Sequence, residues 1–363
     1  MIDERKVVIL GSTGSIGVQA LEIIEKNPTL FKVVGLVAGG NNLELYEAQK
    51  QKFKVENSGL GIAAAIDIAA SECDIVLNGI TGSIGLGPTL AALAAGNKVA
   101  LANKESLVAG GELVVKYGRE NLIPVDSEHS AIYQALKSGR REEVSKFVLT
   151  ASGGPFRDRS DLNSVTVEEA LAHPTWNMGP VVTINSATLV NKGLEIIEAH
   201  YLFDIPYGKI EAVIHPQSVI HSMVEFVDGS TIAQASPPNM KGPIAYALSD
   251  GTRVNGAMNP IDWSKSSTWN FAPIDEVKFP AIRVAREVGV KGGGFTAIFN
   301  AANEVAVDAF LKGSIKFSDI VRNVEAVLSK FSNQSPFQIR DLADVSAIEN
   351  DARAYSVQLI KGV

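Results

Sequence analysis

The chain has 363 residues, of which 46% are hydrophobic, and a formal net charge of -7. This length exceeds what one hydrophobic core usually supports, so we expect two or three domains. Basic residues are scattered among acidic ones, which argues against a nucleic-acid partner. We find no apolar signal core at the N-terminus and no stretch able to span a bilayer, and we therefore expect a soluble, cytoplasmic protein without a membrane partner. The only cysteine, Cys73, excludes an intrachain disulfide and a multi-cysteine metal site.

Short apolar runs alternate with helical patterns from Lys6 to Ser152, which predicts an α/β region with a parallel sheet and crossover helices. The expected strands are Val7–Leu10, Val33–Ala38, Asp74–Asn78, Lys98–Ala102, Leu122–Val125 and Phe147–Ala151. The expected helices are Ile16–Lys26, Gly87–Ala95, Ser106–Gly118 and Ser130–Lys137. The segment Leu43–Ala65 looks short for a crossover with a helix and a strand of its own.

The remainder of the chain predicts two further regions and a linker. An α+β region with an antiparallel sheet is indicated by a helix at Leu189–Tyr201 and by β-branched runs at Val181–Ile184, Ala212–Ile214, Val219–Phe226 and Ser230–Ala235. Residues 251–280 are rich in Gly, Pro, Asn and Ser, as is typical of a linker. A small C-terminal α-helical bundle is predicted by helical spacing in Ile282–Val288, Phe295–Leu311, Phe317–Phe331 and Val345–Leu359.

A glycine-rich loop, Gly11-Ser-Thr-Gly14-Ser-Ile-Gly17, joins the first expected strand to the first expected helix. In this context backbone N–H groups can approach a pyrophosphate at the helix N-terminus, which predicts a dinucleotide site in a Rossmann-like domain. The alternative is a tight turn that needs glycine only for its backbone geometry. The second strand ends in Gly39-Gly40-Asn41-Asn42, without the acid that often binds the ribose of NAD, and this favours NADP.

Three carboxylates form a candidate metal site. Asp126 and Glu128 follow an apolar run, and both would point to one face if the strand continued through them. With Glu195 they would make an all-oxygen set, which suits Mg²⁺ or Mn²⁺ better than Zn²⁺. Such an ion could chelate two adjacent oxygens of a hydroxyketone. The alternative is that Asp126 and Glu128 cap the helix that follows.

Polar strings elsewhere offer the donors that bind a phosphate monoester. They contain Ser152, Ser186, Asn191 and Lys192, although turn and capping chemistry is an alternative role for the two serines. Lys192 precedes Glu195 by three residues, so both should share one helix face.

Two further segments are candidates for the same site. The loop His173–Gly179 has the aromatic, thioether and glycine of a closing lid, with a buried anchor as the alternative role of Trp176. Lys104 and Glu105 follow a strand end where ligands gather in doubly wound sheets, the alternative being a solvated helix start.

Seven sequence strings occur in an order that resembles the 1-deoxy-D-xylulose 5-phosphate reductoisomerase family. They are Gly-Ser-Thr-Gly-Ser-Ile-Gly, Leu-Ala-Asn-Lys-Glu-Ser, Pro-Val-Asp-Ser-Glu-His, Ser-Gly-Gly-Pro-Phe-Arg, His-Pro-Thr-Trp-Asn-Met-Gly, Asn-Lys-Gly-Leu-Glu and His-Pro-Gln-Ser-Val-Ile-His-Ser-Met. The resemblance implies a homodimeric enzyme of the non-mevalonate isoprenoid route that uses NADPH and Mg²⁺ or Mn²⁺, with Co²⁺ as a further candidate. Its reaction would convert 1-deoxy-D-xylulose 5-phosphate to 2-C-methyl-D-erythritol 4-phosphate by a retro-aldol and aldol rearrangement followed by hydride transfer.

The resemblance also implies a role for each motif residue. The metal ligands would be Asp126, Glu128 and Glu195, with Lys104 as a catalytic contact beside them. The substrate would be bound by Ser127, Ser152, His173, Trp176, Met178, Ser186, Asn191, Lys192, Ser218 and His221. NADPH would be bound by Thr13, Gly14, Ser15, Ile16, Gly39, Gly40, Asn41, Asn103, Glu105, Gly179 and Met240. The chain departs from some relatives, which carry lysine where Gly40 stands.

On this basis we expect four segments. They are an NADPH-binding domain (1–126), a catalytic, metal-binding and dimerisation domain (127–250), a linker (251–280) and a helical domain (281–363). Two other functions would also fit a glycine-rich nucleotide loop. A phosphorylating semialdehyde dehydrogenase needs an activated cysteine, and Cys73 has no basic partner nearby in sequence. An NADP-binding regulatory protein without turnover would have lost the carboxylates and donor strings that this chain keeps.

Overall fold

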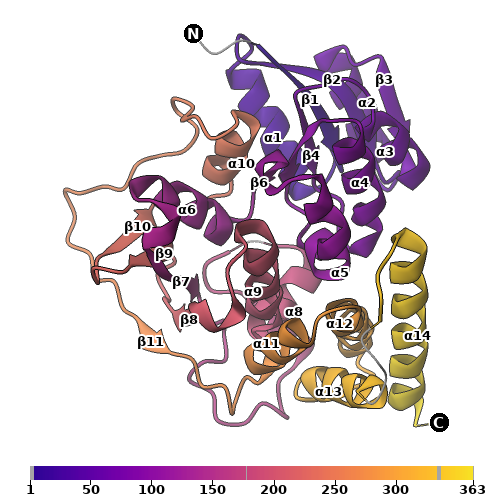
Figure 1. The fold of residues 1–363 in the computed structure, drawn as a ribbon, viewed down its shortest axis with the longest axis vertical. Coiled ribbons are helices and arrows are strands. Elements are labelled where there is room, and N and C mark those ends of the chain that lie inside the picture. The colour runs from indigo at the N-terminus through magenta and orange to yellow at the C-terminus, as the bar shows by residue number, and fades with distance from the viewer. Residues whose placement is uncertain (1–3, 177, 333–336, 363) are drawn as a thin grey trace.

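The computed structural model describes residues 4–176, 178–332 and 337–362. Met1–Asp3 and Asn177, which belong to the expected charged N-terminus and lid loop, lie outside the described residues. Figure 1 shows a first sheet with its helices, a second sheet beside it, and a group of C-terminal helices coloured orange to yellow. This arrangement confirms the predicted fold class. In the described part of the chain, we find no helix that combines the length and the apolar character needed to cross a membrane.

The first sheet is parallel and has the strand order β3-β2-β1-β4-β5-β6. Its strands are β1 (Arg5–Leu10), β2 (Phe31–Ala38), β3 (Asn57–Leu60), β4 (Ile75–Asn78), β5 (Lys98–Leu101) and β6 (Leu122–Pro124). Its helices are α1 (Ser15–Lys26), α2 (Leu43–Phe53), α3 (Gly61–Ala69), α4 (Leu86–Ala94) and α5 (Lys104–Val114). The direction of winding reverses between β1 and β4, and ligands bind at such switch points.

The central strands of this sheet are apolar because both of its faces are covered. On β1, Val8 and Leu10 join the core cluster that includes residues of α3, α4 and α5. Val7 and Ile9 join the other cluster, which includes α1 and α10 (Lys241–Leu248), a helix that the sequence did not predict. The segment Leu43–Ala65 does hold a helix and a strand, α2 and β3, together with the start of α3.

The second sheet is mixed, with the order β10-β9-β7-β8-β11. Its strands are β7 (Val144–Ala151), β8 (Ile210–Ile214), β9 (Ile220–Phe226), β10 (Thr231–Ala235) and β11 (Ala272–Pro273), and only β7 and β8 run parallel. The prediction that Phe147–Ala151 belongs to the parallel sheet was therefore wrong. After β6, helix α6 (Ser127–Ala135) packs against β9 and β10, so the chain has already left the first sheet when β7 begins.

The predicted strand Val181–Ile184 was also wrong, because this segment lies in helix α8 (Pro180–Ala187). Pro180 occupies the first helical position, where its fixed φ favours a helix. Ile184 is fully buried in the core, and α8 packs against α9 (Val190–Phe203) and α12 (Phe295–Leu311). Packing has thus overridden the strand preference of β-branched residues. A short helix, α7 (Val167–Leu171), precedes this region.

The C-terminal region is helical, as predicted. It contains α11 (Ala281–Lys291), α12 (Phe295–Leu311), α13 (Asp319–Phe331) and α14 (Leu342–Lys361). Helix α12 packs against α13 and α14, and α11 packs against α9 of the middle region. Residues 251–280, expected as a linker, have little regular structure but contribute β11 to the edge of the second sheet.

Candidate active site and family

A cavity of about 460 Å³ is lined by residues of the first sheet region, the second sheet, α8 and α9. The cavity is lined by all four residues predicted at the metal site, which are the three proposed metal ligands Asp126, Glu128 and Glu195 and the neighbouring Lys104. The predicted substrate-binding residues that line it are Ser127, Ser152, Trp176, Met178, Ser186, Asn191, Lys192, Ser218 and His221. The predicted cofactor-binding residues that line it are Gly14, Ser15, Ile16, Glu105, Gly179 and Met240. Residues far apart in sequence thus meet at one site.

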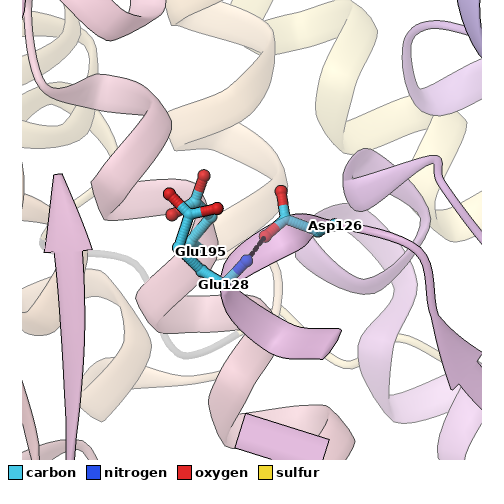
Figure 2. A group of neighbouring side chains, drawn as sticks. All are labelled: Asp126, Glu128 and Glu195. Carbon is cyan, nitrogen blue, oxygen red and sulfur yellow. Dashed lines mark hydrogen bonds between the residues drawn. The ribbon is translucent and has the colours of Figure 1, made fainter. Parts of the chain in front are cut away.

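Three carboxylates converge in this cavity. Asp126, Glu128 and Glu195 each offer an oxygen atom, and these atoms lie within 4.8 Å of one another (Figure 2). The local structure differs from the expected extended strand, because β6 ends at Pro124 and Asp126 is the N-cap of α6. Oδ1 of Asp126 accepts hydrogen bonds from the backbone N–H groups of Glu128 (3.1 Å) and His129 (3.4 Å). Asp126 therefore caps the helix with one oxygen and keeps the other for the cavity.

Two ammonium groups lie among the carboxylates, that of the buried Lys192 and that of the partly buried Lys104. Nζ of Lys104 is 3.0 Å from Oδ2 of Asp126 and 3.0 Å from Oε1 of Glu195. Nζ of Lys192 donates to Oε1 of Glu128 at 2.7 Å and to Oε2 of Glu195. Two ammonium groups face the three carboxylates, and the nearby His129 is paired with a fourth carboxylate, Glu198, so the cluster keeps an excess of negative charge among oxygen ligands. Such a set fits a hard divalent cation such as Mg²⁺.

Charge and burial act against each other on the titrating groups of this cluster. Burial opposes ionisation of Asp126, but Lys104 and His129 outweigh it and hold the pKa of Asp126 well below its usual range. Burial and the nearby Glu128 raise the pKa of Glu195. Burial disfavours the charge on Lys104, yet the surrounding carboxylates raise its pKa well above the usual value. The surrounding carboxylates therefore favour the ammonium form of Lys104.

A second pair of residues, His129 and Glu198, lies next to the carboxylates and supports them. His129 is fully buried, with Nδ1 3.1 Å from Oε2 of Glu198 and Nε2 2.9 Å from the carbonyl oxygen of Glu195. Burial lowers the pKa of His129, but Glu198 more than offsets this and raises it to about 9. Nε2–H donates to the Glu195 carbonyl and so ties α6 to α9. Glu198 was not predicted from the sequence, although its place one turn after Glu195 on a predicted helix was a usable signal.

Hydroxyl groups on the far side of the cavity meet around one histidine. Nε2 of His173 is 3.0 Å from Oγ of Ser152 and 3.1 Å from Oγ of Ser186. Nδ1 accepts from the backbone N–H groups of Thr175 (3.1 Å) and Trp176 (2.9 Å), which assigns the proton to Nε2. Burial lowers the pKa of His173, in keeping with a neutral ring. His173 does not line the cavity itself but orients two serines that do.

The expected lid residue Trp176 is half-buried, and its ring lies edge-on to His221, 6.2 Å between ring centroids. His221 is held by Ser236, whose carbonyl oxygen lies 3.1 Å and whose Oγ lies 3.0 Å from its Nε2. Trp176 thus forms part of the cavity wall. Whether it moves as a lid stays a prediction.

The glycine-rich loop needs its glycines for close packing. Gly11 has φ +80°, and a Cβ on it would lie 2.8 Å from the carbonyl oxygen of Gly79. A Cβ on Gly17 would collide with the backbone of Gly11 and Ser12. The N-terminus of α1 is uncapped by any side chain, and Gly14 and Ser15 line the cavity there, so the loop has both the geometry of a tight turn and the free helix start that suits an anion.

The other predicted cofactor residues surround this loop without lining the cavity. Thr13 lies within the loop, and Gly39, Gly40 and Asn41 follow the carboxyl end of β2, beside β1. Added Cβ atoms on Gly39 and Gly40 would meet nothing within 4 Å, so the backbone there is accessible.

Asn103 is buried and supports the loop that follows β4. Its Nδ2 donates to the carbonyls of Ile80 (2.5 Å) and Gly82 (2.8 Å) and to Oε2 of Glu105 (3.1 Å). Burial raises the pKa of Glu105 to about 7. The sequence analysis missed residues 79–81, which line the cavity after β4. Their position after a strand at the switch point was the available signal.

Comparisons with known proteins agree with the motifs. Models of the 1-deoxy-D-xylulose 5-phosphate reductoisomerase family match residues 7–61 and 57–111, and models of its C-terminal domains match residues 122–203 and 235–355. The reductoisomerase of Leifsonia xyli subsp. xyli is 58% identical over 94% of this chain and 95% of its own. That of Kitasatospora griseola is 52% identical over 98% of this chain and 100% of its own.

Solved structures give the same result. The reductoisomerase of Zymomonas mobilis in complex with NADPH superposes with a TM-score of 0.92 at 38% identity, covering 99% of this chain and 100% of that one. A reductoisomerase in complex with NADPH, fosmidomycin and magnesium gives a TM-score of 0.88 at 35% identity, covering 98% of each chain. The resemblance indicated by the sequence motifs is therefore confirmed, and this chain belongs to the 1-deoxy-D-xylulose 5-phosphate reductoisomerase family of enzymes.

Proposed function

We propose that the protein catalyses the NADPH- and divalent-metal-dependent conversion of 1-deoxy-D-xylulose 5-phosphate to 2-C-methyl-D-erythritol 4-phosphate, a step of the non-mevalonate isoprenoid route. The observation that carries this proposal is the single cavity that joins three converging carboxylates, a set of phosphate-type donors and the N-terminus of α1. Relatives at 50–58% identity bear the name of this activity.

Asp126, Glu128 and Glu195 are the proposed ligands of Mg²⁺, Mn²⁺ or Co²⁺. The fit rests on an all-oxygen set within 4.8 Å and on the excess negative charge left by the two lysines. The bound ion would act as a Lewis acid toward two adjacent oxygens of a hydroxyketone. The relative in complex with magnesium supports the choice of metal.

The proposed roles of the remaining polar residues follow from their charge and position. Ser152 and Ser186, oriented by His173, and Asn191 and Lys192 would bind the substrate phosphate. This remote binding energy would hold both fragments in place while the carbon skeleton rearranges. The ammonium group of Lys104 would donate to a substrate oxygen that gains negative charge.

Other lining residues would complete the substrate site. Ser127, Ser218 and His221 would contact the substrate, while Trp176 and Met178 would exclude water from it.

The dinucleotide is proposed to bind along the carboxyl edge of the first sheet. Its pyrophosphate would lie at the N-terminus of α1, against residues 13–16. Residues 39–41 would face its adenosine end, and Gly179 and Met240 its nicotinamide end. Asn103 and Glu105 would support the loop after β4, between these two ends of the dinucleotide. The relative in complex with NADPH supports this cofactor.

We further propose the division into residues 1–126, 127–250, 251–280 and 281–363, a cytoplasmic location and a homodimer. The homodimer is supported by the outer edge of β10, whose residues are mostly exposed and which pairs only with β9 among the described strands. An exposed edge strand is a template for pairing with a second copy.

The proposed reaction is tested by following NADPH absorbance with purified protein and Mg²⁺ or Mn²⁺. We expect oxidation only when 1-deoxy-D-xylulose 5-phosphate is added, and product analysis should show the branched polyol phosphate. NADPH binding without turnover at any metal would instead favour the regulatory protein. A protein that binds no NADPH would contradict both functions.

A further inference from the structure

A charged cluster outside the cavity joins the last helix to the N-terminal region. Nη2 of Arg353 on α14 donates to Oε2 of Glu304 on α12 (2.7 Å) and to Oγ of Ser83 (3.2 Å). Ser83 in turn donates to Oε2 of Glu349, one turn earlier on α14 (2.7 Å). Ser83 and Glu349 are only 8% and 5% exposed. Ser83 and Arg353 are 270 positions apart in the chain, so this contact is a tertiary one.

Ser83 ends a loop that borders the candidate active site. The loop follows β4, and its residues 79–81 line the cavity. Asn103 holds this loop from the side of α5 through the carbonyls of Ile80 and Gly82. Ser83 is the residue through which α14 of the C-terminal region holds this loop.

The same loop also touches the glycine-rich loop. The two backbones approach so closely that a Cβ on Gly11 would lie 2.8 Å from the carbonyl oxygen of Gly79. A displacement of residues 79–83 would therefore change the cavity wall and the support of the glycine-rich loop together.

We propose that Arg353 is a positioning residue for the dinucleotide half of the active site, acting through Ser83 to fix residues 79–81 against the glycine-rich loop. The proposal rests on the proposed NADPH site, because it takes these loops to border the bound dinucleotide. It assigns a role in cofactor affinity to a C-terminal helix that does not line the cavity.

The chemistry of the cluster explains why Arg353 is needed. Its guanidinium serves Ser83 and two carboxylates, with Nη1 a further 3.4 Å from Oε2 of Glu349. Oε1 of Glu349 is buried and has no hydrogen-bond partner among the described residues. Without Arg353, the carboxylates of Glu304 and Glu349 would lose a shared counter-charge, and their repulsion would loosen α14 from the loop. Lysine cannot reproduce this forked geometry.

The test compares Arg353→Gln with Arg340→Gln in the full-length protein. Arg340 is a matched control because it also pairs with an acid of α14, Asp344 (2.8 Å), but its side chain is exposed and makes no hydrogen bond to Ser83. NADPH dissociation constants are measured by fluorescence titration, and kcat and both KM values by steady-state kinetics. For Arg353→Gln we expect a fivefold to thirtyfold weaker NADPH affinity, on the order expected for lost charge-assisted hydrogen bonds. The KM for the sugar phosphate and kcat at saturating NADPH should change by less than about twofold.

Two further variants keep the proposal testable if Arg353→Gln folds poorly. Ser83→Ala leaves the ion pairs intact and removes only the link to the loop, so NADPH should bind about twofold to fivefold more weakly. Arg353→Lys keeps the charge and should give an intermediate affinity. In the double variant Ser83→Ala/Arg353→Gln the effects should be less than additive, because both changes break one contact.

The outcomes separate this proposal from the proposed function. Wild-type protein that binds NADPH, with unchanged affinity in folded Ser83→Ala and Arg353→Gln, would refute the positioning role alone. A fall in kcat and a rise of both KM values by the same factor would also refute it, since that is the mark of general structural damage. Wild-type protein that binds no NADPH would refute the proposed function and this proposal with it.

Discussion

Replacing Glu195 with glutamine is the most direct test of the carboxylate cluster. Oε1 of Glu195 accepts from Lys104 (3.0 Å) and Asn191, and Oε2 accepts from Lys192. The change removes one negative charge while keeping the shape of the side chain. At an effective dielectric constant of 20, a divalent ion and a carboxylate 4 Å apart interact by about 8 kcal/mol. If the attraction between Glu195 and the two lysines, which the ion must displace, offsets about three quarters of this, about 2 kcal/mol is lost, or about thirtyfold in Mn²⁺ affinity.

Mn²⁺ binding by Glu195→Gln is measured by electron paramagnetic resonance or calorimetry, and turnover by NADPH absorbance. We expect at least a thirtyfold weaker Mn²⁺ affinity, turnover near background and NADPH affinity within about twofold of wild type. Asp250→Asn is the matched control. The Asp250 carboxylate also meets two cations, Lys98 (2.7 Å) and Arg5 (3.8 Å), but does not line the cavity. Unchanged Mn²⁺ affinity in folded Glu195→Gln would show that the three acids are no metal site.

Three further substitutions probe other parts of the site. Lys192→Ala should raise the KM for the sugar phosphate at least tenfold, because a charged donor to the phosphate is lost, with little change in NADPH affinity by fluorescence titration. Gly11→Ala should lower the melting temperature and weaken NADPH binding, since φ is +80° and the new Cβ would lie 2.8 Å from the Gly79 carbonyl oxygen. Glu105→Gln should stabilise the protein more at pH 8 than at pH 5 in thermal melts. Burial raises the pKa of Glu105 from 4.5 to about 7, so wild-type stability falls as pH rises through this window, by up to about 3 kcal/mol; an equal stabilisation at both pH values would contradict this.

The sequence predicted the first sheet well because its strands are short, buried and apolar. Val7–Leu10 and Val33–Ala38 lie within β1 and β2, and the glycine-rich loop lies between β1 and α1 as expected. Predictions failed where local preference and packing disagreed. The β-branched run Val181–Ile184 favours a strand by composition, but Pro180 begins a helix there and Ile184 is buried among core residues. No local sequence pattern indicates that Ile184 is buried in this way.

For the candidate site, the sequence predicted three acids that do converge in the structure, but it predicted them from a geometry that was partly wrong. Asp126 and Glu128 were expected to alternate along a strand, whereas the N-cap and first turn of α6 bring them together. Either geometry places two carboxylates close in space, so the metal-site prediction did not depend on the error. Contacts between distant segments, such as His129 with Glu198 and Ser83 with Arg353, could not be predicted, because they arise only when the regions pack.

The two lysines explain how three carboxylates can lie so close together in the folded chain. Acids within 4.8 Å of one another repel, and burial adds the cost of removing their charges from water. Lys104 and Lys192 offset both costs by donating to all three carboxylates, and His129 adds charge from behind. The oxygen atoms are thus held together by the fold itself. A cation would meet a preorganised set of ligands, but it would compete with two ammonium groups for the same oxygens. The lysines therefore favour a divalent ion over a monovalent one, since only the larger charge gains enough to displace them.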